Sequence, residues 1–528
     1  MPDTERSTLP SKKGVLLLFA VLMLCLVAVF GRTTNYVFVN WDDELYVMNN
    51  PDIREISAEN AMRWLTRPYV ALYVPLPMFS YALDYHFYGL APQGFHRTNT
   101  GLHLAATGLL FFILVFLYKD PLLAFLAALL FGLHPVQVES VAWISQRKNL
   151  LCGVFLFAGF FSYIRGAAVT RDRKWMTAAV TFFVLALLSK ATAVIVPLIL
   201  LAFDYFFRGT TGKRKGFLLS LFLLIPALAM AGFTLALYPE IFTRIKFMQI
   251  LDYPLMQIKT FFFYIKLTLW PQPLSLTYEY ARDLYGTPGR FAVAAGFTVM
   301  AAGLVRATWK KRREAFWLWW FLLFLMPVCG LFRVPIADRH LYIPLAGLSG
   351  LAAAAGVRHR RLMLMALAVA VAVSSQMTLK RLPVWHDSYT LWRTVLQSRD
   401  PETGFLARMK LAALEEDYGN WENALALYRS VLDRNPRLPY AYLNYYNLCI
   451  LHERKEEAEK ARRLFRKNYS SHYDLDTLYR RLVAAKQDPA RVRELLAAVM
   501  IDHGENTGDT VLSNLTRKSP FLSRERVS

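Results

Sequence analysis

The sequence predicts an all-α, polytopic membrane protein with a second, soluble helical region near its C-terminus. Three observations support this fold class. Of 528 residues, 55% are hydrophobic and only 19% are charged, which is fewer charges than a soluble chain of this length usually carries. Apolar runs that approach the roughly 20 residues needed to cross a bilayer recur through most of the chain. After Trp385 the composition changes to amphipathic helix.

The positive charge of the chain indicates membrane topology. A formal charge of +22 would suggest nucleic acid as a partner of a soluble protein. Here the basic residues gather in short loops between apolar runs, as is typical of cytoplasmic loops, and they would also attract anionic lipids. No nucleic acid is therefore expected. The basic clusters lie at residues 171–174, 213–215, 310–313 and 358–361.

Loop charges and the parity of the crossings then orient the chain. The first apolar run covers residues 14–30 and follows Lys12 and Lys13, which places the segment after it outside the cytoplasm. The apolar segment 261–270 is interrupted by lysines, so we interpret it as an interfacial helix. About eleven spans result. Unusual polar residues then gather on the outer face: Asp42, Asp43, Glu139, Arg147, Lys148, Lys190, Arg339 and His340.

The tripeptide Trp41-Asp42-Asp43 is the strongest local signal in the chain. Adjacent carboxylates at a membrane boundary are costly, which suggests a chemical role. The alternative is helix capping or turn formation before Glu44, and for Asp43 this reading weighs as much as a direct role. For Asp42 we favour a role as the base that activates an acceptor hydroxyl.

A second polar segment, residues 134–143, interrupts an apolar stretch. Pro135 suits the first position of a helix. On such a helix Glu139, Trp143 and Arg147 would follow each other one turn apart on one face, where they could hold a sugar and a phosphate. The alternative is a structural Glu139–Arg147 ion pair, since buried charges are usually paired.

Further cations could bind a phosphate. Lys190 lies between two short apolar runs, and Arg339-His340 precedes another. Each of these cations could instead extend from a helix end to the membrane interface. The sequence has no glycine-rich phosphate loop, no Ser-His-Asp arrangement and no zinc spacing, which leaves little support for an ATPase, a serine hydrolase or a zinc protease.

The C-terminal region contains degenerate tetratricopeptide signatures. Ala424, Tyr428 and Pro436 match the second helix of one repeat, and Ala458 continues at the 34-residue period. Arg462 stands where an apolar residue is usual. We predict about two repeats and a third through residues 482–499, which could bind a partner or only cap the membrane domain. We predict a transmembrane catalytic domain at residues 1–380, with the first external loop at 31–100. A tetratricopeptide-like helical domain follows at 381–505, and the tail at 506–528 is predicted to be disordered.

Several of these motifs follow each other in a family-specific order. They are Trp41-Asp42-Asp43, Tyr73-x-Pro75-Leu76, Gly94-Phe95-His96-x-x-Asn99-x-x-x-His103, His134-Pro135-x-x-x-Glu139-Ser140-Val141-Ala142-Trp143-x-x-x-Arg147-Lys148, Ser189-Lys190, and Asp338-Arg339-His340-Leu341-Tyr342-x-Pro344. The chain thus resembles the membrane O-mannosyltransferases with tetratricopeptide repeats and their bacterial relatives, within the GT-C glycosyltransferase fold. The family's Arg-Tyr-Leu-Tyr appears here as Arg339-His340-Leu341-Tyr342.

The resemblance implies a polyprenyl-phosphate sugar as donor and an inverting reaction at Asp42 and Asp43, with Glu139 orienting the sugar or the acceptor. A divalent Mg or Mn ion bridging Asp42 or Asp43 to the phosphate is considered as an option. The expected phosphate-binding residues are Arg147, Lys148, Lys190, Arg339 and His340, and the expected sugar- or acceptor-binding residues are Trp41, His96, His134, Trp143 and Tyr342.

The acceptor stays open between Ser/Thr of a protein, held by the C-terminal repeats, and a glycan or lipid. A transporter of lipid-linked sugar or a non-catalytic scaffold are the alternatives from other classes. A transporter should show internal repeats of its spans, and none is clear. The expected location is a bacterial inner membrane with the site and C-terminal region on the periplasmic side, and the alternative is the endoplasmic reticulum membrane.

Overall fold

The computed structural model describes residues 11–69, 72–166, 172–208, 213–237, 252–276, 278, 287–329, 336–397, 401–435, 438–469 and 474–484. The regular elements in these ranges are helices. Isolated β-bridges pair Tyr69 with Leu72 and Tyr278 with Ile336. The all-α prediction is confirmed. The chain divides into two compact units, Met1–Asp387 and Ser388–Ser528.

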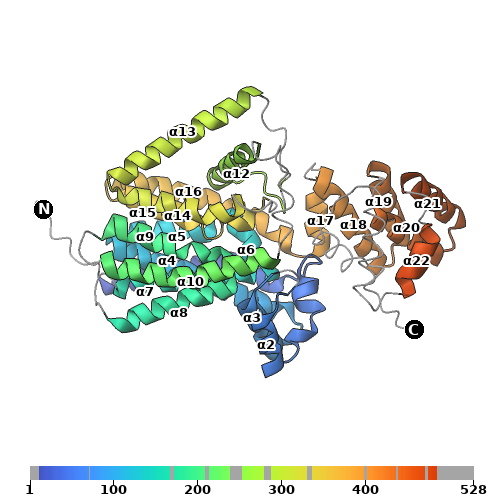
Figure 1. The fold of residues 1–528 in the computed structure, drawn as a ribbon, viewed down its shortest axis with the longest axis horizontal. Coiled ribbons are helices and arrows are strands. Elements are labelled where there is room, and N and C mark those ends of the chain that lie inside the picture. Colours follow the sequence, from blue (N-terminus) through green and yellow to red (C-terminus); the bar gives the residue numbers. More distant parts are fainter. Residues whose placement is uncertain are drawn as a thin grey trace, which may run out of the picture. The chain divides into compact units, whose positions relative to one another are not determined.

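The first unit contains the apolar helices (Figure 1). They are α1 (Lys12–Phe30), α2 (Ala58–Thr66), α3 (Pro75–Tyr88), α4 (Pro92–Tyr118), α5 (Pro121–Leu133), α6 (Val138–Ala142), α7 (Arg147–Arg165), α8 (Arg173–Ser189), α9 (Val196–Phe207), α10 (Lys213–Leu237), α12 (Asp252–Leu269), α13 (Thr287–Trp309), α14 (Arg313–Cys329), α15 (Leu345–Gly356) and α16 (Arg360–Arg381).

Proline and short polar side chains set where several of these helices begin. Helices α3, α4 and α5 each have proline in the first turn, where the missing N–H is not needed. The side chain of Asp120 accepts a hydrogen bond from the Leu123 N–H at 3.2 Å and caps α5, and Ser57 caps α2 in the same way. These helix beginnings divide the chain into separate helices where apolar composition alone would suggest one continuous helix.

Glycines allow the helices of this unit to pack closely. Helix α4 contacts α5 and α7, and α14 contacts α15. A Cβ atom on Gly350 of α15 would lie 2.1 Å from the Trp317 ring of α14, so any larger residue would push the two helices apart. Close approach at small residues is how helices associate in a bilayer, where the lipid supplies no hydrophobic drive.

Three helical segments within the described ranges are long and apolar enough to cross a membrane: Lys12–Asn35, Pro92–Tyr118 and Arg360–Trp385. A fourth crossing is formed if α5 and α6, which meet at a bend of 48°, count as one. Shorter apolar helices include Ala191–Phe207 and Leu345–Gly356. The chain is a helical membrane protein, and the prediction of about eleven spans stays a prediction.

The segment between α1 and α4 folds into a small helical layer. A cluster of buried side chains joins the segment after α1 to α2, α3 and the start of α4. Tyr46, Trp64 and Phe95 are among its members, and each is less than 5% exposed. This apolar cluster fixes the backbone on both sides of Asp42 and Asp43.

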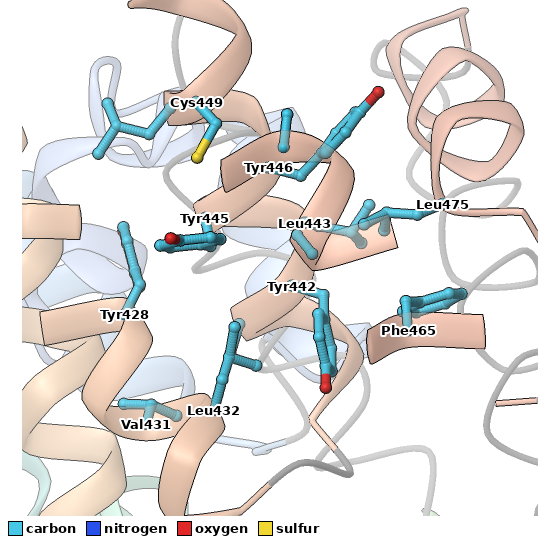
Figure 2. Close-up of a cluster of buried hydrophobic side chains, with 14 of the residues drawn as sticks. Tyr428, Val431, Leu432, Tyr442, Leu443, Tyr445, Tyr446, Cys449, Phe465 and Leu475 are labelled. Atoms are coloured by element: carbon cyan, nitrogen blue, oxygen red, sulfur yellow. The ribbon is translucent and has the colours of Figure 1, made fainter. Parts of the chain in front are cut away.

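The second unit consists of α17 (Ser388–Gln397), α18 (Pro401–Asp417), α19 (Trp421–Arg434), α20 (Pro439–Leu451), α21 (Lys455–Asn468) and α22 (Leu475–Ala484), each of which contacts the next. Figure 2 shows its core, in which aromatic side chains of α19, α20 and α21 come together. Tyr442 meets Phe465 edge-on at 5.5 Å.

The predicted repeat positions occupy this core. Ala424 of α19 and Ala458 of α21 are both buried, as small residues at helix crossings must be. Arg462 instead pairs with Asp474 at 3.3 Å at the surface. The repeat assignment itself stays a prediction, because Pro436, the third repeat beyond Ala484 and the tail after 505 lie outside the described residues.

Candidate functional site

The acidic pair lies in a tight turn between α1 and α2. The carbonyl of Asp42 accepts hydrogen bonds from the N–H groups of Leu45 and Tyr46 at 3.0 and 2.9 Å, and its side chain is half-buried. Asp43 is 1% exposed. Its Oδ2 accepts from the Val39 N–H at 3.1 Å, and its Oδ1 accepts from the N–H of Ser145 at 3.0 Å and from the Ser145 hydroxyl.

These contacts separate the roles of the two carboxylates. The Asp43 side chain makes no capping bond to the short helix η2 (Glu44–Met48), so side-chain capping is wrong for it. It instead ties the segment between α1 and α2 to the segment before α7. Burial raises the pKa of Asp43 to about 7, although the donors from Ser145 and Val39 oppose the shift. Both oxygens of Asp43 therefore accept hydrogen bonds from protein donors.

Glu139 of α6 pairs with Arg339 of the short helix η9 (Asp338–Leu341). Glu139 Oε2 accepts from the Arg339 backbone N–H at 2.7 Å, and its Oε1 accepts from Arg339 Nη1 at 2.6 Å. Glu139 is 1% exposed and the Arg339 side chain is 16% exposed. The buried end of the pair is thus the carboxylate, while the guanidinium reaches toward the site surface.

The alternative pairing of Glu139 with Arg147 is wrong, because the helix breaks between them. Helix α6 ends at Ala142, Trp143 adopts an extended backbone conformation, and α7 begins only at Arg147. Glu139, Trp143 and Arg147 therefore do not share one helix face.

Arg147 is held in a separate buried network. Its side chain is fully buried and forms an ion pair with Asp84 of α3. Nε donates to Asn99 Oδ1 at 2.8 Å, and Nη2 donates to the Phe95 carbonyl at 2.8 Å. The guanidinium carbon lies 4.9 Å from the centre of the Tyr81 ring. Because protein groups occupy its donors, Arg147 is not placed to bind a donor phosphate, contrary to the sequence-based expectation.

Two lysines and Arg339 form the cationic part of the site. Lys190, between α8 and α9, donates to the Asn149 side-chain oxygen. Lys148 Nζ lies 5.2 Å from the centre of the Tyr46 ring and has no hydrogen-bond or ion-pair partner within the part of the chain that the structure describes. Burial lowers the pKa of Lys148 to about 8, and the negative charge of Asp42 opposes that shift. Burial also acts to lower the pKa of Arg339, but the negative charges of Glu139 and then Asp42 raise it overall. Asp42 and Glu139 are thus both carboxylates whose charge acts on Lys148 and Arg339.

Indole rings pack beside these charges, and Trp143 and Trp385 among them are buried. Trp143 stacks on Trp385 with ring centres 5.4 Å apart and an angle of 19° between the rings. The ring of Trp41 lies 6.4 Å from Trp143, and the Arg339 guanidinium lies 5.6 Å from the same ring. Aromatic faces beside hydrogen-bonding groups are the usual lining of a small-molecule site.

The remaining predicted sugar- or acceptor-binding residues are buried in helix contacts. His96 is 1% exposed and meets the Tyr36 ring edge-on. His134 Nε2 hydrogen-bonds the Thr268 carbonyl at 3.0 Å, and Tyr342 hydroxyl contacts His103 Nδ1 at 3.1 Å.

These contacts indicate structural positions for His96, His134 and Tyr342.

His340, from the predicted phosphate-binding set, is half-buried and lies edge-on to the Tyr264 ring, with ring centres 6.4 Å apart.

The residues around Asp42 do not fit a divalent ion. A metal would need the oxygens of Asp43, and these accept bonds from Ser145 and Val39. The described ranges contain no group of three or more His, Cys, Asp or Glu side chains placed to bind a metal. We derive no step through a metal ion.

Sequence reasoning missed the residues that connect the site. Asn149 donates to the Arg339 carbonyl at 3.2 Å while it accepts from Lys190. Asp338 is 1% exposed and accepts from the Tyr278 hydroxyl, and it lies 3.9 Å from Arg381. Burial raises the pKa of Asp338, and the negative charge of Glu139 adds to that rise. The signal available in the sequence was an asparagine or aspartate next to a predicted cation: Asn149 follows Lys148, and Asp338 precedes Arg339.

Lys190 provides a pH-dependent test of this site. Burial lowers the pKa of Lys190 to about 7. The ammonium form needed to bind a phosphate is therefore lost as the pH rises through neutrality, and we expect the donor KM to increase between about pH 6 and about pH 9. Arginine stays charged over this range, so Lys190→Arg should flatten the profile. Parallel profiles for wild type and Lys190→Arg would contradict the role of Lys190.

No protein-family model matches the chain. It is 32% identical over 114 residues to the protein O-mannosyl-transferase TMTC3 of Mus musculus, and 31% identical over 202 residues to TMTC1 of the same species. It is 29% identical over 201 residues to TMTC4 of Homo sapiens. These matches cover 22%, 34% and 34% of this chain, but only 12%, 21% and 26% of the relatives' own lengths.

Among solved structures, ArnT from Cupriavidus metallidurans bound to undecaprenyl phosphate aligns with 97% of this chain and 76% of its own, at 14% identity and a TM-score of 0.33. That similarity is too low to support a conclusion. The sequence matches, together with the ordered motifs, identify the chain as a relative of the TMTC protein O-mannosyl-transferases.

Proposed function

We propose that the chain is an integral membrane glycosyltransferase of the GT-C type. It would move a sugar from a polyprenyl-phosphate donor to an acceptor hydroxyl, that of Ser or Thr in a protein. The observation that carries this proposal is the grouping of Lys148, Lys190 and Arg339, two of which Asn149 joins, beside stacked indole rings. The charge of the half-buried Asp42 acts on Lys148 and Arg339. The similarity to protein O-mannosyl-transferases supports the choice of reaction.

The proposed reaction inverts the anomeric carbon. The acceptor oxygen forms a bond to that carbon as the bond to the phosphate oxygen of the lipid carrier breaks. Asp42 takes the proton of the acceptor hydroxyl, and the electron pair of the broken bond stays with the lipid phosphate. The charge that develops on the phosphate is stabilised by Lys148, Lys190 and Arg339, which are held in place before the reaction.

The buried carboxylates Glu139 and Asp43 hold the proposed catalytic and phosphate-binding residues in place. Glu139 holds Arg339 through both its backbone N–H and its guanidinium, so that the cation keeps one orientation. Asp43 fixes the turn that presents Asp42 by accepting bonds from Ser145 and Val39. Trp41, which is half-buried beside the buried Trp143, offers its face to the sugar.

The position of the site relative to the membrane is also part of the proposal. Charge distribution supports a periplasmic site in a bacterial inner membrane, with an endoplasmic reticulum membrane as the alternative. The C-terminal helices α18 to α21 would hold the acceptor polypeptide as tetratricopeptide-like repeats.

Transfer from labelled donors tests the proposal. Wild-type protein in liposomes receives a panel of radiolabelled polyprenyl-phosphate sugars and an acceptor-containing lysate, with Asp42→Asn as the inactive reference. Label in protein for wild type alone supports the proposal, and label in glycan or lipid changes the acceptor class. Label that stays on the carrier with every donor, or that crosses the bilayer unchanged, refutes the transferase in favour of a scaffold or a transporter.

A further inference from the structure

An apolar cavity with a volume of about 430 Å³ lies within the membrane unit, between α12, α13, α14 and α15. Gly303 and Leu304 of α13 and Phe321 of α14 are among the residues that line it. A Cβ atom on Gly303 would meet no other atom within 4 Å, so the α13 wall of the cavity borders open space at this glycine. The four helices therefore do not fill this space themselves.

The chemistry of the lining selects an apolar occupant. Thr268 and Trp317 are the lining residues with polar side-chain groups, and both groups are engaged. The Thr268 hydroxyl donates to the Tyr264 carbonyl at 2.8 Å, and the Trp317 indole N–H donates to the Tyr118 hydroxyl. Water needs polar partners to occupy a cavity, whereas about 150 Å³ of apolar space is enough to hold a benzene ring. A hydrocarbon chain is thus the ligand that this space fits.

The cavity lies within one leaflet's depth of the turn that joins α13 to α14. Figure 1 shows the two helices meeting at this turn and diverging away from it. Leu304 lies about 8 Å along α13 from Trp309, the last residue of that helix. Phe321 lies about 12 Å along α14 from Arg313, its first residue. One leaflet supplies about 15 Å of hydrocarbon, half of the bilayer core, so an acyl chain whose headgroup lies at the turn would reach the cavity.

The turn carries four consecutive cations, residues 310–313. Lys310 and Arg312 are exposed and have no acidic partner among the described residues. Glu314, in the first turn of α14, offsets one of the four charges. Trp309 is 81% exposed beside them, and exposed indoles are typical of the membrane–water interface. The turn thus combines a net positive charge with an interfacial position, which is what attracts the phosphate of an anionic lipid.

Contacts with α9 fix the position of this turn. Lys311 Nζ lies 5.6 Å from the centre of the Tyr205 ring, and the Arg313 guanidinium carbon lies 5.4 Å from the centre of the Phe207 ring. The Tyr205 hydroxyl also donates to the Thr308 carbonyl at 3.3 Å. The cationic end of the site is therefore held in place by the protein before any lipid binds.

We propose that the cavity and this turn together bind one anionic phospholipid of the adjacent leaflet, which the charge distribution predicts to be the cytoplasmic one. One acyl chain fills the cavity, and the lipid phosphate lies against Lys310 and Arg312. The bound lipid fills the space between α13 and its neighbours and holds α13 against them. The proposal does not depend on the proposed function, because it concerns a lipid of the bilayer and not the sugar donor.

Native mass spectrometry of the purified protein tests the headgroup end of the site. The protein in detergent is titrated with dioleoyl phosphatidylglycerol and with dioleoyl phosphatidylcholine, which share their acyl chains and differ in net charge. We expect one phosphatidylglycerol to bind at least about tenfold more tightly than phosphatidylcholine. Lys310→Gln combined with Arg312→Gln should remove that preference, since the attraction of two juxtamembrane cations accounts for at least this factor.

The matched control is Arg358→Gln combined with Arg361→Gln, which removes two exposed cations from the region between α15 and α16. This control should keep the preference for phosphatidylglycerol. Equal losses in the two double variants would overturn the proposal, because they would show attraction to the whole basic face and not to one site. A preference that survives the loss of Lys310 and Arg312 would overturn it as well.

Gly303→Leu tests the apolar end, because the new side chain enters the open space of the cavity. We expect the affinity for phosphatidylglycerol to fall at least about tenfold. Gly232→Leu makes the same change at an exposed position of α10, where a Cβ atom also meets nothing within 4 Å, and it should leave the affinity unchanged. Met300→Trp, at a second lining position, repeats the test if Gly303→Leu fails to fold.

Two results would overturn the acyl-chain assignment. One is wild-type affinity for phosphatidylglycerol in a folded lining variant. The other is one-for-one displacement of phosphatidylglycerol by an equimolar amount of undecaprenyl phosphate, which would assign the cavity to a polyprenyl lipid.

Discussion

Replacing Asp42 by Asn is expected to reduce the rate of sugar transfer about 10²–10⁴-fold, the usual contribution of a general base. The donor KM should change little or fall slightly, because the variant removes a negative charge that acts on Lys148 and Arg339. Initial rates at several donor concentrations in liposomes separate the two parameters. A rate within tenfold of wild type would show that another group takes the proton.

Asp43→Asn is the matched control for Asp42→Asn, since it makes the same chemical change one residue away. Asp43 is buried and accepts bonds from Ser145 and Val39, so its replacement should lower the unfolding temperature. Asp42 is half-buried and its replacement should leave that temperature nearly unchanged. If Asp43→Asn were stable but inactive while Asp42→Asn stayed active, Asp43 would be the base and Asp42 the structural carboxylate.

Arg147→Met is expected to destabilise the membrane unit by about 3–5 kcal/mol, because it leaves Asp84 buried without its cation. The Arg147 side chain is fully buried and that of Asp84 is only 7% exposed. Thermal unfolding in detergent, followed by tryptophan fluorescence, measures the effect. The double variant Asp84→Asn with Arg147→Met should lose less than the two single changes combined, since it leaves no unpaired charge.

Arg360→Met provides the comparison for Arg147→Met. Arg360 pairs with Asp120 at 2.5 Å, but its side chain is 54% exposed. A solvent-exposed pair of this kind contributes about 0–1 kcal/mol. Equal losses of stability for Arg147→Met and Arg360→Met would contradict the structural role of Arg147.

Sequence reasoning could predict the parts of the site whose signal is local. Asp42, Lys190 and Arg339 stand out because each is a charged residue at the edge of an apolar run, where charge is costly. The same reasoning misassigned Arg147, since it assumed a continuous helix through Trp143. The extended backbone at Trp143 breaks that helix, and no proline or glycine at that residue marks the break.

The pairings within the site could not be predicted for a different reason. Arg339 meets Glu139 only after many intervening helices have packed. No rule of residue spacing relates two positions so far apart in the chain, so the sequence does not reveal which residue pairs with which. The cavity between α12, α13, α14 and α15 is similar. Periodic apolar residues indicate a helix face, but they do not say whether that face meets a neighbouring helix, ordinary lipid or a ligand.

The separation of 200 residues between Glu139 and Arg339 also sets an order of events during synthesis. At roughly 5–20 residues per second, Glu139 leaves the ribosome about 10–40 seconds before its cation does. Throughout that interval an acidic side chain destined for burial has no guanidinium to neutralise it. The nascent membrane unit must therefore keep α6 hydrated or shielded until η9 arrives, and a chain interrupted before Arg339 would expose this unneutralised carboxylate to quality control.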